Sequence, residues 1–243
     1  MFLATSTLLL ALTLPFLIAA EAVSKPGASI PAPSCHKYVI VDSRGTGEGQ
    51  GQHSQFSGMI QKTLSSLPGG ISVSNPYPAS SAPNSPSDGA AWLRNYLKQG
   101  VAACPRQKYA LLGWSQGASV TWIGIEDLKK GDPVYHAIKA IVVVGDPFHL
   151  PNTLGNVDEM GHALTAGAEG FMSGGFADST ITRWAATGKV LDICYSGDAV
   201  CNRQAGGFAN HGKYGGTAEV QTLGGQFLMQ KLGFRMEHRK RRM

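Results

Sequence analysis

A Gly-Trp-Ser-Gln-Gly turn at 113–117 constrains the fold of this chain more than any other segment. An apolar run at 109–112 precedes it, and a helix-like stretch at 118–130 follows it. Glycine at both ends of such a turn lets the backbone reverse between a buried strand and a helix, which leaves the serine hydroxyl exposed. Amides at the start of the helix favour negative charge near that hydroxyl. The motif predicts that Ser115 is a nucleophile; an ordinary strand–helix turn is the alternative in a chain with 31 glycines.

Short apolar runs alternate with amphipathic stretches along most of the chain. Strands are expected at 38–42, 71–78, 109–112, 139–145 and 190–195, and helices at 53–67, 86–103, 118–130 and 215–233. This alternation is typical of a mostly parallel sheet with helices on both faces, a three-layer α/β/α sandwich. The chain has neither an internal repeat nor a linker between two such units. We therefore expect a single domain at 35–234.

The two ends of the chain differ from this domain in composition. Residues 1–20 end in an apolar run that is too short to span a bilayer and closes with small residues, as a secretory signal peptide does. Residues 21–34 are rich in Pro, Ala and Ser and are expected to form a flexible leader. Residues 235–243 form a basic tail in which five Lys and Arg residues less one Glu supply four of the five net charges. Because the rest of the chain is nearly neutral, we expect no nucleic-acid partner. The short apolar run predicts an extracellular protein without stable membrane insertion.

Four cysteines agree with export, because extracellular cysteines usually pair. Cys194 and Cys201 are close in sequence and flank a Gly-Asp turn, so a bridge between them is the simplest of three possible pairings, which leaves Cys35 and Cys104. A zinc site is the alternative, but the chain has no CxxC motif and no histidine within a few residues of the Cys194 and Cys201 pair. We therefore expect no zinc site at these cysteines.

A nucleophilic serine needs a base that takes its proton and a carboxylate that orients the base. In a fold of this type the acid and then the base follow the serine along the chain. His211 lies in the loop before the last predicted helix and is the preferred base. His149, which follows Gly145-Asp146 at the same edge of the predicted sheet, is the alternative.

Asp198, Asp146 and Asp192 compete for the role of the acid. Asp192 lies inside a predicted strand, and Asp146 could cap a turn. Asp198 is preferred because a disulfide around it would limit the motion of its loop, and a catalytic carboxylate needs rigid support. Both preferred residues have ordinary alternatives, since Gly-Asp is common in turns and His211 could be a surface loop residue.

An ester carbonyl under attack needs preorganised donors for its oxyanion. One candidate is the backbone N–H of Gln116, directly after the serine, and the other is Thr46 in the glycine-rich loop 44–51. A glycine-rich connector without a ligand is the alternative. A phosphate-binding loop is not expected, because no Gly-Lys-Ser/Thr follows.

At this point the chain resembles the cutinase family, which comprises small secreted α/β hydrolases and includes acetylxylan esterases. The resemblance extends from about 35 to 232 and rests on Arg44-Gly45-Thr46, the turn at 113–117, Gly145-Asp146-Pro147, Cys-x-x-Gly-Asp-x-x-Cys at 194–201, and His211 with Tyr214. It implies a triad of Ser115, Asp198 and His211, an oxyanion hole of Thr46 and Gln116, and the disulfides Cys35–Cys104 and Cys194–Cys201. It also implies an open, lidless site without metal or cofactor.

Two departures from the family pattern concern the substrate. Trp114 stands where Tyr is usual, and the segment 205–212 lacks the aliphatic residues that line a typical acyl groove. Phe148, Leu150 and Phe208 are expected to supply the apolar wall instead. We therefore expect a monomeric secreted serine esterase that hydrolyses carboxylic esters, with the polyester cutin as first choice. The alternatives are an acetylxylan or short-chain esterase and, in another class, a catalytically inactive wall-binding or effector protein.

Overall fold

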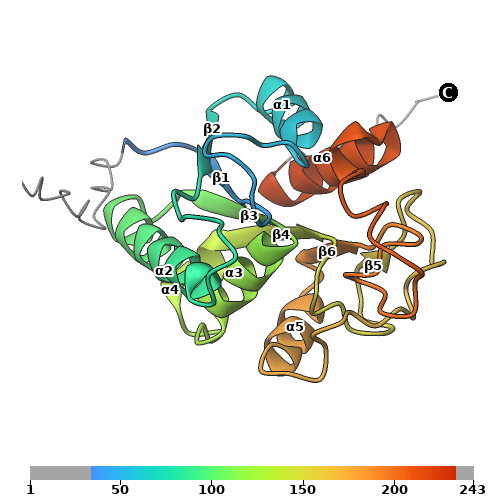
Figure 1. Cartoon of the computed structure of the whole chain (residues 1–243). Helices are drawn as coiled ribbons and strands as arrows, with labels where there is room; N and C mark the ends of the chain where they lie inside the picture. Colours follow the sequence, from blue (N-terminus) through green and yellow to red (C-terminus); the bar gives the residue numbers. More distant parts are fainter. Residues whose placement is uncertain (1–33, 234–243) are drawn as a thin grey trace, which may run out of the picture.

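The structure is a computed structural model that describes residues 34–233, so the expected signal peptide, nearly all of the leader and the basic tail lie outside the described residues. A single sheet passes through the middle of the molecule (Figure 1). Its six strands are all parallel and lie in the order β2-β1-β3-β4-β6-β5. The strands are β1 (Tyr38–Ser43), β2 (Gly70–Ser74), β3 (Lys108–Trp114), β4 (Ile138–Val144), β5 (Asn156–Val157) and β6 (Val190–Ile193).

Helices cover both faces of this sheet (Figure 1). One face carries α1 (Ser57–Ser66) and α6 (Ala218–Leu232); the other carries α2 (Ser85–Ala103), α3 (Gln116–Ile125), α4 (Pro133–Ala137) and α5 (Asp178–Ala185). Successive residues of β1 alternate between the two layers: Tyr38 and Ile40 pack toward α1 and α6, and Val39 and Val41 pack toward α2 and α3. A parallel strand buried on both faces reads as a continuous apolar run, and the expected three-layer α/β/α sandwich is confirmed.

The structure differs from the expected elements in two respects. The helix after the serine turn ends at Ile125 rather than 130, because a turn closed by the Leu128 N–H and the Ile125 carbonyl begins there. Furthermore, α4, β5 and α5 were not expected, since each is too short to show a clear apolar period. The last two elements flank long loops at the right of Figure 1, beside β6, where most of the irregular structure gathers.

Within residues 34–233, no helix has both the length and the apolar character that a bilayer crossing requires. The same part of the chain holds no cluster of three or more His, Cys, Asp or Glu side chains suited to a metal ion. Two disulfides join Cys35 to Cys104 and Cys194 to Cys201, which is the pairing that the family resemblance implies.

Candidate active site

Ser115 lies between β3 and α3 in a backbone conformation that only a tightly packed turn enforces. Its φ of 55° and ψ of −118° are unusual for a residue with a side chain. A Cβ atom on Gly113 would lie 2.4 Å from the Gly117 carbonyl oxygen, and one on Gly117 would lie 2.0 Å from the Ser43 oxygen. Both glycines are therefore needed for close backbone approach. The turn places Ser115 at the carboxyl ends of the parallel strands, where ligands bind in such sheets.

His211 and Asp198 are brought together in the two loops that follow β6. The His211 Nδ1 atom lies 2.9 Å from Oδ2 and 3.1 Å from Oδ1 of Asp198. Because an ionised carboxylate can only accept, Nδ1 must be the donor, and Nε2 of the neutral ring then carries a lone pair. Asp198 is fully buried, whereas the His211 side chain is 17% exposed. This arrangement gives His211 the form that a general base requires.

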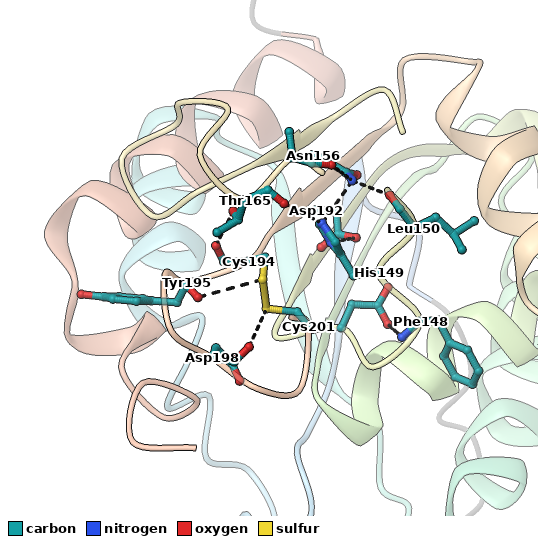
Figure 2. A network of polar contacts seen from close by, with 12 residues as sticks. Phe148, His149, Leu150, Asn156, Thr165, Asp192, Cys194, Tyr195, Asp198 and Cys201 are labelled. Atoms are coloured by element: carbon teal, nitrogen blue, oxygen red, sulfur yellow. Dashed lines mark hydrogen bonds and ion pairs between the residues drawn. A yellow bond between two sulfur atoms is a disulfide. The ribbon is translucent and has the colours of Figure 1, made fainter. Parts of the chain in front are cut away.

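The Asp198 carboxylate is held by two further donors. The Tyr214 hydroxyl donates to Oδ2 over 2.5 Å, and the Val200 backbone N–H donates to Oδ1 over 2.9 Å. Burial, and next the nearby Asp198 charge, raise the pKa of Tyr214 well above its usual value, so the hydroxyl keeps its proton. The Cys194–Cys201 disulfide closes this loop beside Asp198 (Figure 2). The acid is therefore fixed from several directions.

Trp114, noted in the sequence only as a departure from the family pattern, anchors the loop of the base. Its indole Nε1–H donates to the His211 backbone oxygen over 3.0 Å, and the two rings lie 5.5 Å apart. Gly145 provides the space for the His211 ring, because a Cβ atom there would lie 2.8 Å from the His211 Cε1 atom. These contacts position His211 next to the residue that precedes Ser115.

Thr46 and Gln116, the predicted oxyanion donors, are joined by a direct hydrogen bond. The Gln116 amide donates to the Thr46 hydroxyl oxygen over 3.1 Å and to the Ser80 carbonyl over 2.8 Å, and it accepts from the Ser85 hydroxyl over 3.0 Å. Since the Thr46 oxygen accepts here, its own proton stays free for another acceptor. The Gln116 backbone N–H lies in the first turn of α3, where amides lack an intrahelical acceptor. Both groups are thus available to an anionic oxygen.

Arg44 holds the loop that carries Thr46, a role that the motif in the sequence did not reveal. Its buried guanidinium donates to the backbone oxygens of Glu48 and Tyr77, and the Tyr77 hydroxyl donates back to the Arg44 backbone oxygen. The Glu48 carboxylate accepts the Gly45 N–H over 3.2 Å. The loop is therefore closed by its own side chains and does not depend on a ligand for its shape.

A second His–Asp pair lies in the interior. His149, the alternative base, has its Nδ1 atom 2.8 Å from Oδ2 of Asp192, and both side chains are buried. Its Nε2 atom lies 3.3 Å from the Thr165 carbonyl oxygen and 3.1 Å from Nδ2 of Asn156 (Figure 2). Because both ring nitrogens contact protein groups in the core, His149 is not accessible to a substrate.

Asp146, the remaining alternative acid, belongs to the same buried cluster. Its carboxylate accepts the Trp122 indole N–H over 2.7 Å and the Phe148 backbone N–H over 2.9 Å. Burial, and next the Asp192 charge, raise the pKa of Asp146 to about 7. Burial lowers the pKa of His149, but the Asp192 carboxylate outweighs this effect and the net shift is upward. The cluster therefore favours a protonated histidine between two acids.

The predicted apolar wall is only partly at the surface. Phe148 is a correction: its side chain is 2% exposed, because it packs into the core with the Phe176 ring 5.1 Å away. Leu150 is half-buried against the same core, whereas Phe208 is 69% exposed. A small cavity of about 390 Å³ is lined by Phe208 and Phe171. Phe171 was not predicted as a site residue, because nothing in the sequence around it predicts that its side chain is exposed.

The comparisons with known proteins agree with this fold. The cutinase family model matches residues 34–232. A cutinase of Kineococcus radiotolerans is 31% identical over 128 residues, which cover 49% of this chain and 44% of that relative. The match therefore spans less than half the length of that curated relative.

Two solved structures extend the likeness over most of the chain. A cutinase-like protein from Cryptococcus sp. is 33% identical, with a TM-score of 0.74 over 82% of this chain and 96% of that one. The catalytic core of an acetyl xylan esterase from Trichoderma reesei is 20% identical, with a TM-score of 0.66 over 82% and 100%, and supports the shared fold alone. Because the family model covers nearly all of the described residues, this chain belongs to the cutinase family.

Proposed function

We propose that this protein is a secreted serine esterase in which Ser115, His211 and Asp198 form the catalytic triad. His211 takes the Ser115 proton through Nε2 while the serine oxygen attacks the ester carbonyl. The His211 imidazolium then gives that proton to the departing alcohol, and an acyl-enzyme remains. His211 next activates a water molecule, which releases the carboxylic acid and restores the serine. The observation that carries this proposal is the buried Asp198, which holds His211 by Nδ1 and leaves Nε2 free.

The surroundings of the triad support each charged state in this cycle. The Asp198 carboxylate accepts hydrogen bonds from Tyr214 and Val200 and lies against Nδ1, where it would stabilise the imidazolium. The oxyanion would be bound by the Gln116 amide and by Thr46, and one such donor contributes about 3–4 kcal/mol to the transition state. Secretion is supported by the apolar segment within residues 1–20 and by the two disulfides. A monomer suffices, because all these groups come from one chain.

We further propose that the substrate is an aliphatic polyester such as cutin. Exposed apolar side chains occur at 171–176, in a loop whose backbone contacts the Asp198 loop, and at 208, three residues before His211: Phe171, Met172, Phe176 and Phe208. Apolar patches of this kind usually mark interaction sites. The Phe171 N–H donates to the Val200 carbonyl, and the His211 N–H donates to the Phe208 carbonyl, so both rings are tied to the triad loops.

An acetyl or short-chain esterase is the second candidate. It is favoured by the small size of the cavity beside Phe208, about 390 Å³, which is far less than that of the cavities elsewhere in the molecule. The acetyl group of an acetylated xylan needs little room, and the polysaccharide itself would remain in solvent. The exposed aromatic rings argue for the longer aliphatic substrate.

The test is a rate profile over p-nitrophenyl esters from acetate to palmitate, together with product release from cutin and from acetylated xylan. We expect kcat/KM to rise beyond acetate and hydroxy acids to be released from cutin. A maximum at acetate with acetic acid released only from xylan would assign the second candidate instead.

A separate measurement addresses catalysis itself. Ser115→Ala is expected to lose nearly all activity, and an organophosphate is expected to label the wild type stoichiometrically at Ser115. Absence of labelling in a folded wild-type protein would favour the inactive wall-binding or effector role.

A further inference from the structure

The edge of the sheet opposite the triad carries a group of unpaired cations. Two adjoining cavities of about 760 and 710 Å³ lie there and share the segment 105–108. Their linings contain five basic side chains and no Asp or Glu, and we call these five the basic face: Lys37, Lys98, Arg106, Lys108 and Lys139. Because β1, β3 and β4 are parallel and all begin at this edge, the basic face points away from Ser115.

None of the five cations forms an ion pair with a carboxylate within residues 34–233. Lys108 donates only to the Leu232 carbonyl, over 2.7 Å. Lys139 is close enough to Lys189 to contribute, after burial, to a pKa of Lys189 lowered to about 8. The positive charges therefore repel one another and have no ion-pair partner among the described residues, which is the condition under which an external anion binds best.

Half of the fourteen carboxylates within residues 34–233 follow the carboxyl ends of the strands or occupy the loops beyond them: Asp42, Glu48, Asp146, Asp158, Glu159, Glu169 and Asp198. Glu126, Asp127 and Asp132 lie instead between α3 and α4, before β4 begins, but none of the three lines the two cavities. A polyanion would therefore meet cations without carboxylates in the lining of the basic face, and several carboxylates at the edge that carries the triad.

The side chains of the basic face favour a carboxylate polymer over a single-stranded nucleic acid or an anionic lipid surface. Besides His36 and His136, its cavity linings hold one Phe, Tyr or Trp residue, the buried Tyr38, so it lacks the exposed large rings on which single-stranded nucleic acids stack. The large exposed apolar side chains of the described residues all lie between 154 and 208, so none is available at this edge for insertion into a lipid surface. Four of its five cations are lysines, which act as point charges toward carboxylates.

We propose that the basic face binds an extended anionic polysaccharide whose charges are carboxylates, as in a polyuronate. Two cavities joined through Arg106 and Lys108 suit an extended chain better than a compact ion. The polymer would hold the molecule by one edge and leave Ser115, at the other edge, free for a second ligand. This inference does not rest on the proposed reaction, since binding requires none of the triad residues.

The test is binding of the full chain in a Ser115→Ala background to polygalacturonate, with an unsubstituted neutral xylan as the control polymer. The double variant Lys98→Ser/Arg106→Ser removes two exposed cations of the basic face. The matched control, Lys62→Ser/Lys213→Ser, removes the same charge from exposed positions on α1 and near Tyr214. At about 50 mM salt we expect the first variant to weaken binding about tenfold and the control less than about twofold, with both differences shrinking as salt rises.

Two further arms complete the test. A chain that lacks residues 234–243 separates the basic face from the basic tail, and it is expected to keep polygalacturonate binding and its sensitivity to Lys98→Ser/Arg106→Ser. Equal weakening by the two double variants, or loss of binding on truncation alone, would overturn the proposal. Tighter binding to anionic phospholipid vesicles or single-stranded DNA than to polygalacturonate would overturn it as well.

Discussion

Three His–Asp pairs lie within residues 34–233, and two of them, His211–Asp198 and His149–Asp192, follow Ser115 in the chain and have nearly the same geometry. Nδ1 lies 2.9 Å from a carboxylate oxygen in the His211–Asp198 pair and 2.8 Å in the His149–Asp192 pair. Both aspartates are buried. The two histidines differ: the His211 side chain is partly exposed, whereas the His149 side chain is buried and its Nε2 atom contacts other protein groups. Pair geometry alone therefore does not identify a catalytic histidine. Of these two histidines, only the one whose Nε2 atom is free of protein contacts can act as a base toward a substrate.

The interior pair supports the exposed one. The His149 carbonyl accepts the Gly170 N–H over 2.9 Å, and the Thr165 hydroxyl, next to His149, donates to the Cys194 carbonyl over 2.8 Å. These contacts connect the loop after β4 to the disulfide loop that holds Asp198 (Figure 2). We infer that the His149–Asp192 pair stabilises the loops that carry the His211–Asp198 pair. Mutation of each histidine should therefore separate an effect on stability from an effect on catalysis.

The largest expected effect is on catalysis. His211→Gln is expected to lower kcat/KM on p-nitrophenyl butyrate about 10⁴-fold or more, as removal of a triad base does. His149→Gln is expected to lower the activity of the folded fraction less than about tenfold, because its ring does not reach the substrate. Activity per mole of folded protein, with the folded fraction taken from circular dichroism, measures both. Comparable losses in the two variants would contradict the assigned roles.

The second effect is on the free energy of unfolding, where His149→Gln is expected to cost more than His211→Gln. His149→Gln leaves the buried Asp192 without its charged partner, and breaking a buried pair costs about 3–5 kcal/mol. His211→Gln leaves Asp198 with its Tyr214 and Val200 donors and is expected to cost about 1 kcal/mol. Urea unfolding followed by circular dichroism gives both values. If His149→Gln unfolds at the wild-type urea concentration, the interior pair has no structural role.

A smaller effect is expected from Tyr214→Phe, which removes one donor to Asp198, the proposed catalytic acid. A hydrogen bond to a charged group contributes about 1.5–3 kcal/mol, so kcat/KM is expected to fall about 10- to 100-fold. The Cys194–Cys201 disulfide stays in place and serves as an internal control for folding, measured by thiol titration. A variant with wild-type kcat/KM would show that Val200 and the disulfide loop hold Asp198 unaided.

The smallest effect concerns the pH dependence of the interior pair. The pKa of His149 is raised in the folded state, so its stabilising contribution is fully present below its unfolded pKa of about 6.5 and is lost as pH rises through the folded value. The loss in unfolding free energy caused by His149→Gln is therefore expected to be larger at pH 6 than at pH 9. Urea unfolding of both proteins at these pH values measures the difference. A cost that is larger at pH 9 would reverse the sign and contradict a charged His149.

The same comparison explains where sequence reasoning succeeded. The turn at 113–117 could be predicted from the sequence because close backbone contacts require glycine at both of its ends. Asp198 was preferred because cysteines flank it, and its Oδ2 atom lies 2.9 Å from Nδ1 of His211 in the structure. His149 stayed an alternative because it also lies in a loop after a predicted strand, with Asp146 three residues before it. Burial, which separates the two histidines, depends on loops more than ten residues away.

Other features of the site were not predictable for the same reason. Trp114 contacts the His211 carbonyl across nearly one hundred positions, and the Gln116 side chain meets Thr46 across seventy. Phe148 looked like a surface residue of a loop, but α5 and its preceding loop bring Phe176 over it. No local pattern encodes such contacts.

The sequence by itself determined the fold class, the serine turn and the residues available as acid and base. Those features follow from short-range chemistry: alternating strands and helices, glycines at a sharp turn, and paired cysteines around a carboxylate. Only the tertiary structure decided which histidine keeps a free nitrogen, which aromatic rings are exposed, and that the cations gather at the edge opposite the triad. Exposure and charge separation are properties of packed surfaces, and residues distant in sequence create them together.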